Sequence, residues 1–259
     1  MAVANADYTF EFVDVGGYGR QSDGGTWKAC ALGRALNDGT LALPEPRTLN
    51  GSSESFPYVF VADAAFPHSV NLLRPYPGFA KQTMTGEQRI FNYRYAHFHS
   101  SHNLKCMRQF IMTYYLLPIT KFLTCFFPRL SRARRVVENA FGILAMKWRI
   151  FIGPMNLQPK NAIATVLACT ALHNFVLRES AASGGSAITP GMVDTEKEDG
   201  TVEPGSWRRE LQDTIALQKL TGNRATKAAL RTREIFTAYF NVGPGIVPWQ
   251  DGLIFGKSV

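Results

Sequence analysis

Hydrophobic and polar residues alternate near the start of the chain, in the run YTFEFVDV at residues 8–15. A period of two is typical of a strand with one buried face, and the glycines that follow it predict a tight turn. A second run, PYVFVA at residues 57–62, is apolar throughout and indicates a strand buried on both faces. Residues 20–55 are polar and rich in glycine and proline, with one short helix predicted at residues 27–36.

Apolar residues recur at helical spacing in three later segments. Residues 131–149 predict an amphipathic helix with Ser131 as its N-cap. Residues 161–178 are apolar almost all round, which is typical of a buried helix, and residues 223–240 predict a final amphipathic helix. Small, polar and acidic residues fill positions 179–206, which predicts a flexible linker. Strands followed by helices around a buried strand indicate an α/β or α+β fold.

The composition is that of a folded intracellular protein. The chain has 259 residues, of which 46% are hydrophobic and 19% are charged, enough for one large domain or two small ones. The four cysteines include no C-x-x-C pair, which indicates reduced thiols and neither a zinc ribbon nor a redox motif. No basic segment followed by an apolar run opens the chain, which argues against a secretory signal. Because it opens almost directly in a strand pattern, we expect upstream sequence to be missing.

A net charge of +8 favours polyanionic partners, and nucleic acid leads among them. Basic residues gather around the helix predicted at residues 131–149, where Glu138 is the one acid. Two interpretations stay open, a surface that contacts a nucleic-acid backbone beside a metal site and a plain solubility face. The basic residues are Arg129, Arg132, Arg134, Arg135, Lys147 and Arg149.

Three carboxylates are candidates for a metal site. Two-metal phosphodiester chemistry needs carboxylates from separate elements, because Mg²⁺ and Mn²⁺ prefer oxygen ligands. Asp63 follows the buried strand at its carboxyl end, where open α/β sheets bind ligands, although an N-cap role fits equally. Asp23 lies between a polar loop and two glycines, where a carboxylate can reach a metal and where an ordinary turn is also common.

Glu138 is the third candidate, in the middle of its predicted helix. It shares a helix face with Gly142 and Ala145, which leave room for another backbone or a ligand. The alternative is an exposed glutamate paired with Arg134 or Arg135 one turn earlier on the helix.

Five motifs together resemble the DDE endonuclease domain of PIF/Harbinger transposases and their domesticated relatives, over most of the chain. They are FVDVGGYGRQSDGG (12–25), YVFVADAAFP (58–67), LLRPYPG (72–78), LSRARRVVENAFGIL (130–144) and ACTALHNF (168–175). The resemblance implies an α/β, RNase H-like core of the retroviral-integrase type, with a mixed sheet flanked by helices. It also implies a metal-dependent nuclease that cuts or transfers phosphodiester bonds of DNA.

Carried over by residue, the resemblance makes Asp63 the second catalytic aspartate, Glu138 the terminal glutamate and Asp23 an auxiliary metal ligand, for Mg²⁺ or Mn²⁺. His173 and Asn174 match the family's helix end, where a buried structural histidine is as good an interpretation as a catalytic one. The implied partners are DNA and a separate DNA-binding protein, without a membrane. The expected location is the nucleus, with the cytoplasm as an alternative.

The chain departs from the family at its start. Asn5 stands where relatives have aspartate, so we expect an N-terminally truncated nuclease with impaired catalysis. The alternative is an inactive, domesticated relic that serves as a DNA- or protein-binding module. We expect a partial nuclease domain at residues 1–178, a flexible acidic linker at 179–212, and a C-terminal helix and tail at 213–259.

A second departure is an insertion at residues 95–129, which relatives lack. The codons for its ending, LTCFFPR, can contain a splice acceptor site. We therefore hypothesise that the segment is a retained intron. Sequencing of the transcript tests this hypothesis. Two alternatives are a membrane span at residues 110–128, which would make the chain a membrane-anchored protein, and a zinc site. The zinc ligands would be His97, His99, His102 and Cys106.

Overall fold

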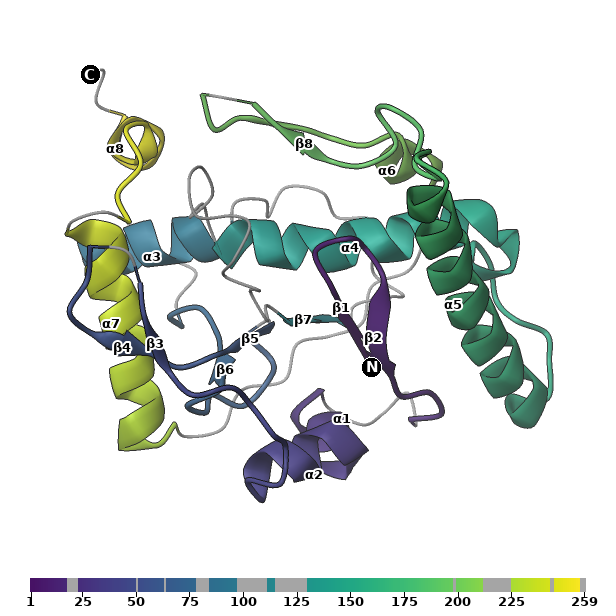
Figure 1. Cartoon of the computed structure of the whole chain (residues 1–259), viewed down its shortest axis with the longest axis horizontal. Coiled ribbons are helices and arrows are strands. Elements are labelled where there is room, and N and C mark those ends of the chain that lie inside the picture. Colours follow the sequence, from purple (N-terminus) through teal and green to yellow (C-terminus); the bar gives the residue numbers. More distant parts are fainter. Residues whose placement is uncertain are drawn as a thin grey trace. The chain divides into compact units, whose positions relative to one another are not determined.

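The chain divides into two compact units, which are described separately. Figure 1 labels their helices and strands. The first unit comprises Met1–Gln21, Ser100–Thr113 and Arg135–Gln218, and the second comprises Ser22–His99, Tyr114–Arg134 and Lys219–Val259. The computed structural model describes residues 1–17, 23–49, 51–62, 64–77, 84–96, 111–114, 130–197, 199–211, 225–242 and 245–256. For residues 23, 95–96, 111–114 and 130–134 it describes the backbone alone.

Three short strands pair in the first unit. Strand β1 (Ala2–Ala4) runs antiparallel to β2 (Phe10–Val13), with Ala2 opposite Val13. Strand β7 (Ile111–Tyr114) pairs with β1 in the parallel sense. The alternation predicted at residues 8–15 thus gives a strand of four residues, and β7 falls inside the segment interpreted as an insertion. The retained-intron hypothesis for residues 95–129 stays a prediction.

The core of the first unit forms where helix α4 (Leu130–Lys147) packs on these strands. Its stripe of Val137, Ala140 and Leu144 is almost wholly buried, as its helical spacing predicts. These residues contact Phe10 of β2 and Cys169 of the next helix. Helix α4 is followed by a 3-10 turn (Arg149–Phe151) and by α5 (Pro159–Ala182).

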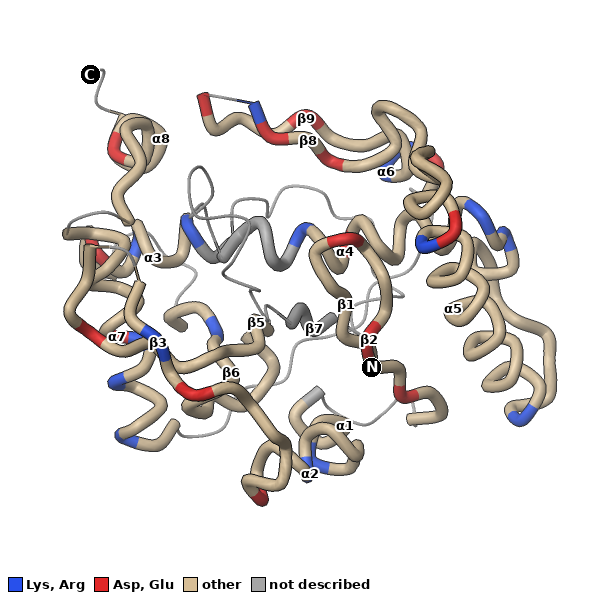
Figure 2. The backbone as a smooth tube through the Cα atoms, viewed as in Figure 1, with Lys and Arg blue, Asp and Glu red and all other residues tan. Residues whose placement is uncertain are grey.

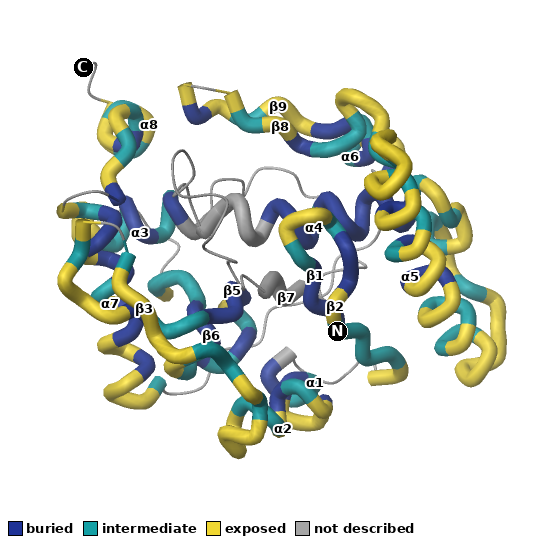
Figure 3. The backbone as a smooth tube through the Cα atoms, in the orientation of Figure 1, coloured by how far each residue is buried: buried dark blue, intermediate teal, exposed yellow. Residues whose placement is uncertain are grey.

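Helix α5 is not the all-round buried helix that its composition predicts. Its buried side chains are Cys169, Thr170, His173 and Leu177, which lie on one face. Leucine and phenylalanine side chains on the opposite face are exposed to solvent. The prediction counted apolar residues without considering which of them find a packing partner, and Figure 3 shows exposed residues recurring along α5.

The segment predicted as a flexible linker carries secondary structure. Helix α5 extends into it as far as Ala182, and a hairpin of β8 (Thr195–Glu196) and β9 (Val202–Glu203) follows. Helix α6 (Trp207–Glu210) ends the described part of the first unit. Composition alone did not indicate these elements, because it says nothing of the partners that polar residues find on α4; the linker at residues 179–212 stays a prediction.

The second unit contains five helices and four strands among its described residues. Helices α1 (Asp23–Ala29) and α2 (Ala31–Asn37) replace the single helix predicted at residues 27–36. The strands are β3 (Arg47–Thr48) and β4 (Ser55–Phe56), which pair antiparallel, and β5 (Phe60–Ala62) and β6 (Leu72–Leu73), which pair in parallel. The remaining helices are α3 (Gly86–Ala96), α7 (Lys227–Asn241) and α8 (Gln250–Phe255).

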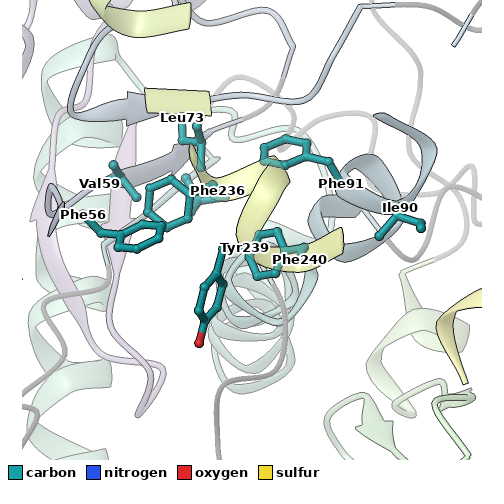
Figure 4. Packing of buried hydrophobic residues seen from close by; sticks show 9 residues of the cluster. Phe56, Val59, Leu73, Ile90, Phe91, Phe236, Tyr239 and Phe240 are labelled. Carbon is teal, nitrogen blue, oxygen red and sulfur yellow. The ribbon is translucent and has the colours of Figure 1, made fainter. Parts of the chain in front are cut away.

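Aromatic side chains dominate the core of the second unit, where α7 packs on α3 and on the strands (Figure 4). Phe56 lies edge to face with Phe236 and Tyr239, at ring-centroid distances of 5.0 and 5.4 Å. Edge-to-face pairs are favoured by the ring quadrupole. This core holds β5 in place. The residue directly after β5 is Asp63, a candidate metal ligand.

Candidate functional site

The three predicted metal ligands differ in how much of them the structure describes. Glu138 belongs to the first unit, and Asp23 and Asp63 belong to the second. Asp23 is the first residue of α1, and its side chain lies outside the described part. Asp63 also lies outside the described residues, directly after β5. Glu138 is therefore the candidate ligand whose contacts can be followed.

Strand β5 has the character that the apolar run predicts. Phe60, Val61 and Ala62 are each at most 3% exposed, so the strand is buried on both faces. The run is shorter than predicted, because the strand begins at Phe60 and not at Pro57. Its carboxyl end, next to a parallel neighbour, is where ligand sites of α/β sheets lie.

The carboxylate of Glu138 faces an arginine from a distant part of the sequence. Its Oε2 lies 2.8 Å from Nη2 of Arg208, which follows α6's first residue, and both side chains are only 11–12% exposed. The same guanidinium donates to both carboxylate oxygens of Asp194, from Nε at 2.8 Å and from Nη2. Arg208 therefore bridges two carboxylates, one from α4 and one from the segment before β8.

Burial by itself lowers the pKa of the Arg208 guanidinium, but the hydrogen bonds and charges of Asp194 and Glu138 outweigh burial and raise it. The group is thus a permanent cation. A divalent metal ion at Glu138 would meet this fixed positive charge at close range. Among the described residues, no cluster of three or more histidine, cysteine, aspartate or glutamate side chains could hold a metal ion.

Arg208 is part of a longer segment, residues 192–211, which we call the strap. The strap lies on α4 through the side chain of Asn139, whose Oδ1 accepts from the backbone N–H of Asp194 at 3.1 Å and from Nε1 of Trp207 at 2.9 Å. Asp194 also accepts from the backbone N–H of Gly205 at 2.8 Å, which closes the strap on itself. Every one of these groups is buried, so the strap is fixed by polar contacts that lack competition from water.

Gly142 provides the space into which the strap packs. A Cβ atom at this position would lie 2.5 Å from the ring of Trp207, whose indole is 1% exposed and contacts Ala145. The sequence predicted room for another backbone or ligand beside Gly142 and Ala145. The structure fills that room with a side chain of the same protein.

Arg135 is a second anchor of the strap, and its environment corrects one expectation. It was counted with the basic residues of a backbone-contacting or solubility surface, but it is only 6% exposed. Its Nη2 lies 2.6 Å from Oε2 of Glu196 in β8. Lys147 and Arg149 are exposed, whereas Arg129 and the side chains of Arg132 and Arg134 lie outside the described part. Figure 2 colours the basic and acidic residues along the backbone.

His173 and Asn174 attach α5 to strand β2. Nε2 of His173 donates to the carbonyl oxygen of Tyr8 at 2.8 Å, and burial lowers the pKa of the ring, which keeps it neutral. Asn174 accepts from the backbone N–H of Phe10 at 2.7 Å and donates to its carbonyl at 2.8 Å. Of the two interpretations of this motif, the contacts support the structural one.

The alternatives for residues 95–129 remain predictions. The four proposed zinc ligands at 97, 99, 102 and 106 lie outside the described residues. No described helix is long and apolar enough to cross a membrane. Most of the span proposed at residues 110–128 is also outside the described part.

Comparisons with known proteins give one match. One family model, described as DDE superfamily endonuclease, matches the chain at residues 1–122 and 117–174. The two segments cover residues 1–174 of 259, and with them the positions of Asp23, Asp63 and Glu138. No curated protein and no solved structure matches. The match spans more than half of the sequence, and the chain belongs to the DDE superfamily endonuclease family.

Proposed function

We propose that this protein is a transposase-derived nuclease of the PIF/Harbinger type, with an RNase H-like core, that binds DNA and acts on its phosphodiester bonds. The observation that carries the proposal is the family match over residues 1–174, which includes all three candidate carboxylates. The mixed α/β fold with short strands is compatible with such a domain. A net charge of +8 supports DNA as the substrate.

Asp63, Glu138 and the auxiliary Asp23 are the proposed metal-holding residues. Family members generally use divalent metal ions, and carboxylate oxygens are the ligands that Mg²⁺ and Mn²⁺ prefer. Such an ion supplies a polarised phosphate oxygen and an activated water. In the structure, Glu138 is bound by Arg208, so the described residues do not fit a metal at this carboxylate until that ion pair opens.

A second function is favoured by that same ion pair. A glutamate neutralised by a buried arginine suits a protein that keeps the nuclease fold and binds DNA or protein without cutting it. Arg208 lies outside residues 1–174, so the family match does not include the group that occupies Glu138. We therefore hold impaired catalysis, or its loss, as the alternative to an active nuclease.

A nicking assay on supercoiled DNA with Mg²⁺ or Mn²⁺ tests the first proposal. An active nuclease loses cutting in the Asp63→Ala and Glu138→Gln variants. The control variants Asp251→Asn and Asp38→Asn, which change exposed acids of the second unit, keep it. Equal cutting by Glu138→Gln and the unchanged protein would reject Glu138 as a ligand.

DNA binding separates the two functions. Fluorescence anisotropy with labelled duplex, at several salt concentrations, reports the number of phosphate contacts through its slope. Salt-sensitive binding without metal-dependent cutting supports the binding module. Absence of both cutting and DNA binding contradicts the nuclease and the DNA-binding module.

Two further proposals concern context. We propose that the protein is located in the nucleus, which imaging of a fluorescently tagged chain in cells tests. We also propose that a separate DNA-binding protein contributes target specificity. Anisotropy with specific and random duplexes tests this, because the chain alone should then bind both with similar affinity.

A further inference from the structure

The strap covers one face of α4, and Glu138 belongs to that face. The residues of α4 that contact the strap recur at spacings of three and four, so they lie on one side of the helix. The apolar stripe that packs on the strands lies on the opposite side. The residues under the strap are Arg135, Glu138, Asn139, Gly142 and Ala145.

The charges of the strap and of α4 are complementary. Arg135 of α4 meets Glu196 at 2.6 Å, and Glu138 of α4 meets Arg208 at 2.8 Å. All four side chains are at most 12% exposed, so water screens these pairs little. Opposite charges that match in this way fix one position of the strap on the helix. At Glu138 the strap therefore supplies the positive charge that a metal ion would otherwise supply.

Arg208 is tied to its own strap more firmly than to α4. Its guanidinium binds both carboxylate oxygens of Asp194, but only one oxygen of Glu138 is its partner here. Asp194 also accepts from the backbone N–H of Gly205, so these three residues are joined within the strap. Because Arg208 is held in this way, leaving Glu138 takes the strap with it as one piece.

We propose that the strap is an autoinhibitory element, which while it lies on α4 keeps Arg208 on Glu138 and a divalent cation away from that carboxylate. The inference rests on the proposed function, since it takes Glu138 as a metal ligand. Two positive charges at one carboxylate repel each other, so the closed strap and the bound cation exclude one another. The apparent affinity for a cation then rises with the fraction of molecules whose strap is lifted.

Gly142→Ala tests the proposal without changing any charge. Its added methyl group would lie 2.5 Å from the ring of Trp207, so it opposes the closed strap, whereas Gly153→Ala meets nothing within 4 Å and is the matched control. Electron paramagnetic resonance of free Mn²⁺, without DNA, measures cation binding. Gly142→Ala should bind Mn²⁺ roughly five to a hundred times more tightly than Gly153→Ala. Adding Glu138→Gln to Gly142→Ala should abolish this gain.

Hydrogen exchange reports whether the strap has lifted. The amide of Asp194 bonds to Asn139 of α4, so it should exchange faster in Gly142→Ala than in Gly153→Ala. It should also exchange faster in the unchanged protein when Mn²⁺ is added. The amide of Gly205 bonds within the strap, so its exchange should change less.

The outcomes separate this inference from the nuclease proposal. Equal Mn²⁺ binding by Gly142→Ala and Gly153→Ala overturns autoinhibition, and so does an unchanged exchange rate at Asp194 in Gly142→Ala. A gain in Mn²⁺ binding that persists after Glu138→Gln also overturns it. The nicking assay is read independently: a gain that depends on Glu138, in a protein that cuts no DNA, supports the role of the strap and contradicts the nuclease.

Discussion

Replacing Arg208 with alanine should destabilise the protein more than any change to an exposed ion pair. The change removes the cation that bridges Asp194 and Glu138, and the side chain of Asp194 is only 1% exposed. The stranded carboxylate still accepts a hydrogen bond from the backbone N–H of Gly205. Breaking one side of a buried ion pair costs about 3–5 kcal/mol, since the remaining charge is buried without compensation.

The contact of the guanidinium with the indole ring adds to this loss. The Arg208 carbon Cζ lies 4.2 Å from the centroid of the Trp207 ring, a cation–π geometry that contributes roughly 0.5–2 kcal/mol. Because Glu138 is 12% exposed, water partly relieves its side of the loss. We therefore expect a decrease of about 3 kcal/mol in the free energy of unfolding.

Urea unfolding of the Arg208→Ala variant measures this decrease. The matched control is Arg149→Ala, whose partner Glu210 lies 3.9 Å away and whose side chain is 74% exposed. A pair of this kind contributes about 0–1 kcal/mol. Hydrogen exchange at the amides of Asp194 and Gly205 localises the effect to the strap, because both amides bond to groups that the substitution disturbs.

A second substitution tests the cause of the loss. Asp194→Asn removes the carboxylate that Arg208→Ala strands, so the double variant should be more stable than the sum of the two single changes predicts. Additive losses would show that the buried charge is not the reason. A loss from Arg208→Ala no greater than that from Arg149→Ala would refute the argument as a whole.

Three further predictions concern α4 and α5. Gly142→Ala should lower the free energy of unfolding in urea by about 1–3 kcal/mol, because its methyl group overlaps the ring of Trp207. Gly153→Ala, with open space around it, should leave the free energy of unfolding almost unchanged. Asn174→Ala should cost about 1–3 kcal/mol in the same assay, because it leaves a backbone N–H and C=O of β2 without this partner; an unchanged midpoint contradicts that role. Burial lowers the pKa of His173 in the folded protein, so acid favours the unfolded state. The free energy of unfolding should therefore fall as the pH drops below the ordinary histidine value of 6.5. It should fall less in the His173→Gln variant.

The elements that the sequence predicted well are those that carry a strong local pattern. Helix α4 and the burial of β5 follow from apolar residues at fixed spacing. Strand β1 and helix α3 were missed. Three residues at the start of a chain are too few to show a period, and α3 has polar residues on most of its surface.

The site was harder to predict, because its contacts join residues far apart in the sequence. The sequence correctly placed Glu138 in a helix beside Gly142. No residue near Glu138 in the sequence indicates its contact with Arg208, which is 70 positions away. One signal was present in retrospect. Trp207 stands in a segment that is mostly small, polar and acidic, and a tryptophan in a presumed linker usually has a place to pack.

The strap also determines how much of the chain is needed for a stable protein. A shorter version ending at residue 174, where the family match stops, would lose every strap contact with α4. Arg135 would lose Glu196, and the space beside Gly142 would lose the ring of Trp207. A stable version of the protein therefore needs the strap and also α7, whose Phe236, Tyr239 and Phe240 belong to the core of the second unit.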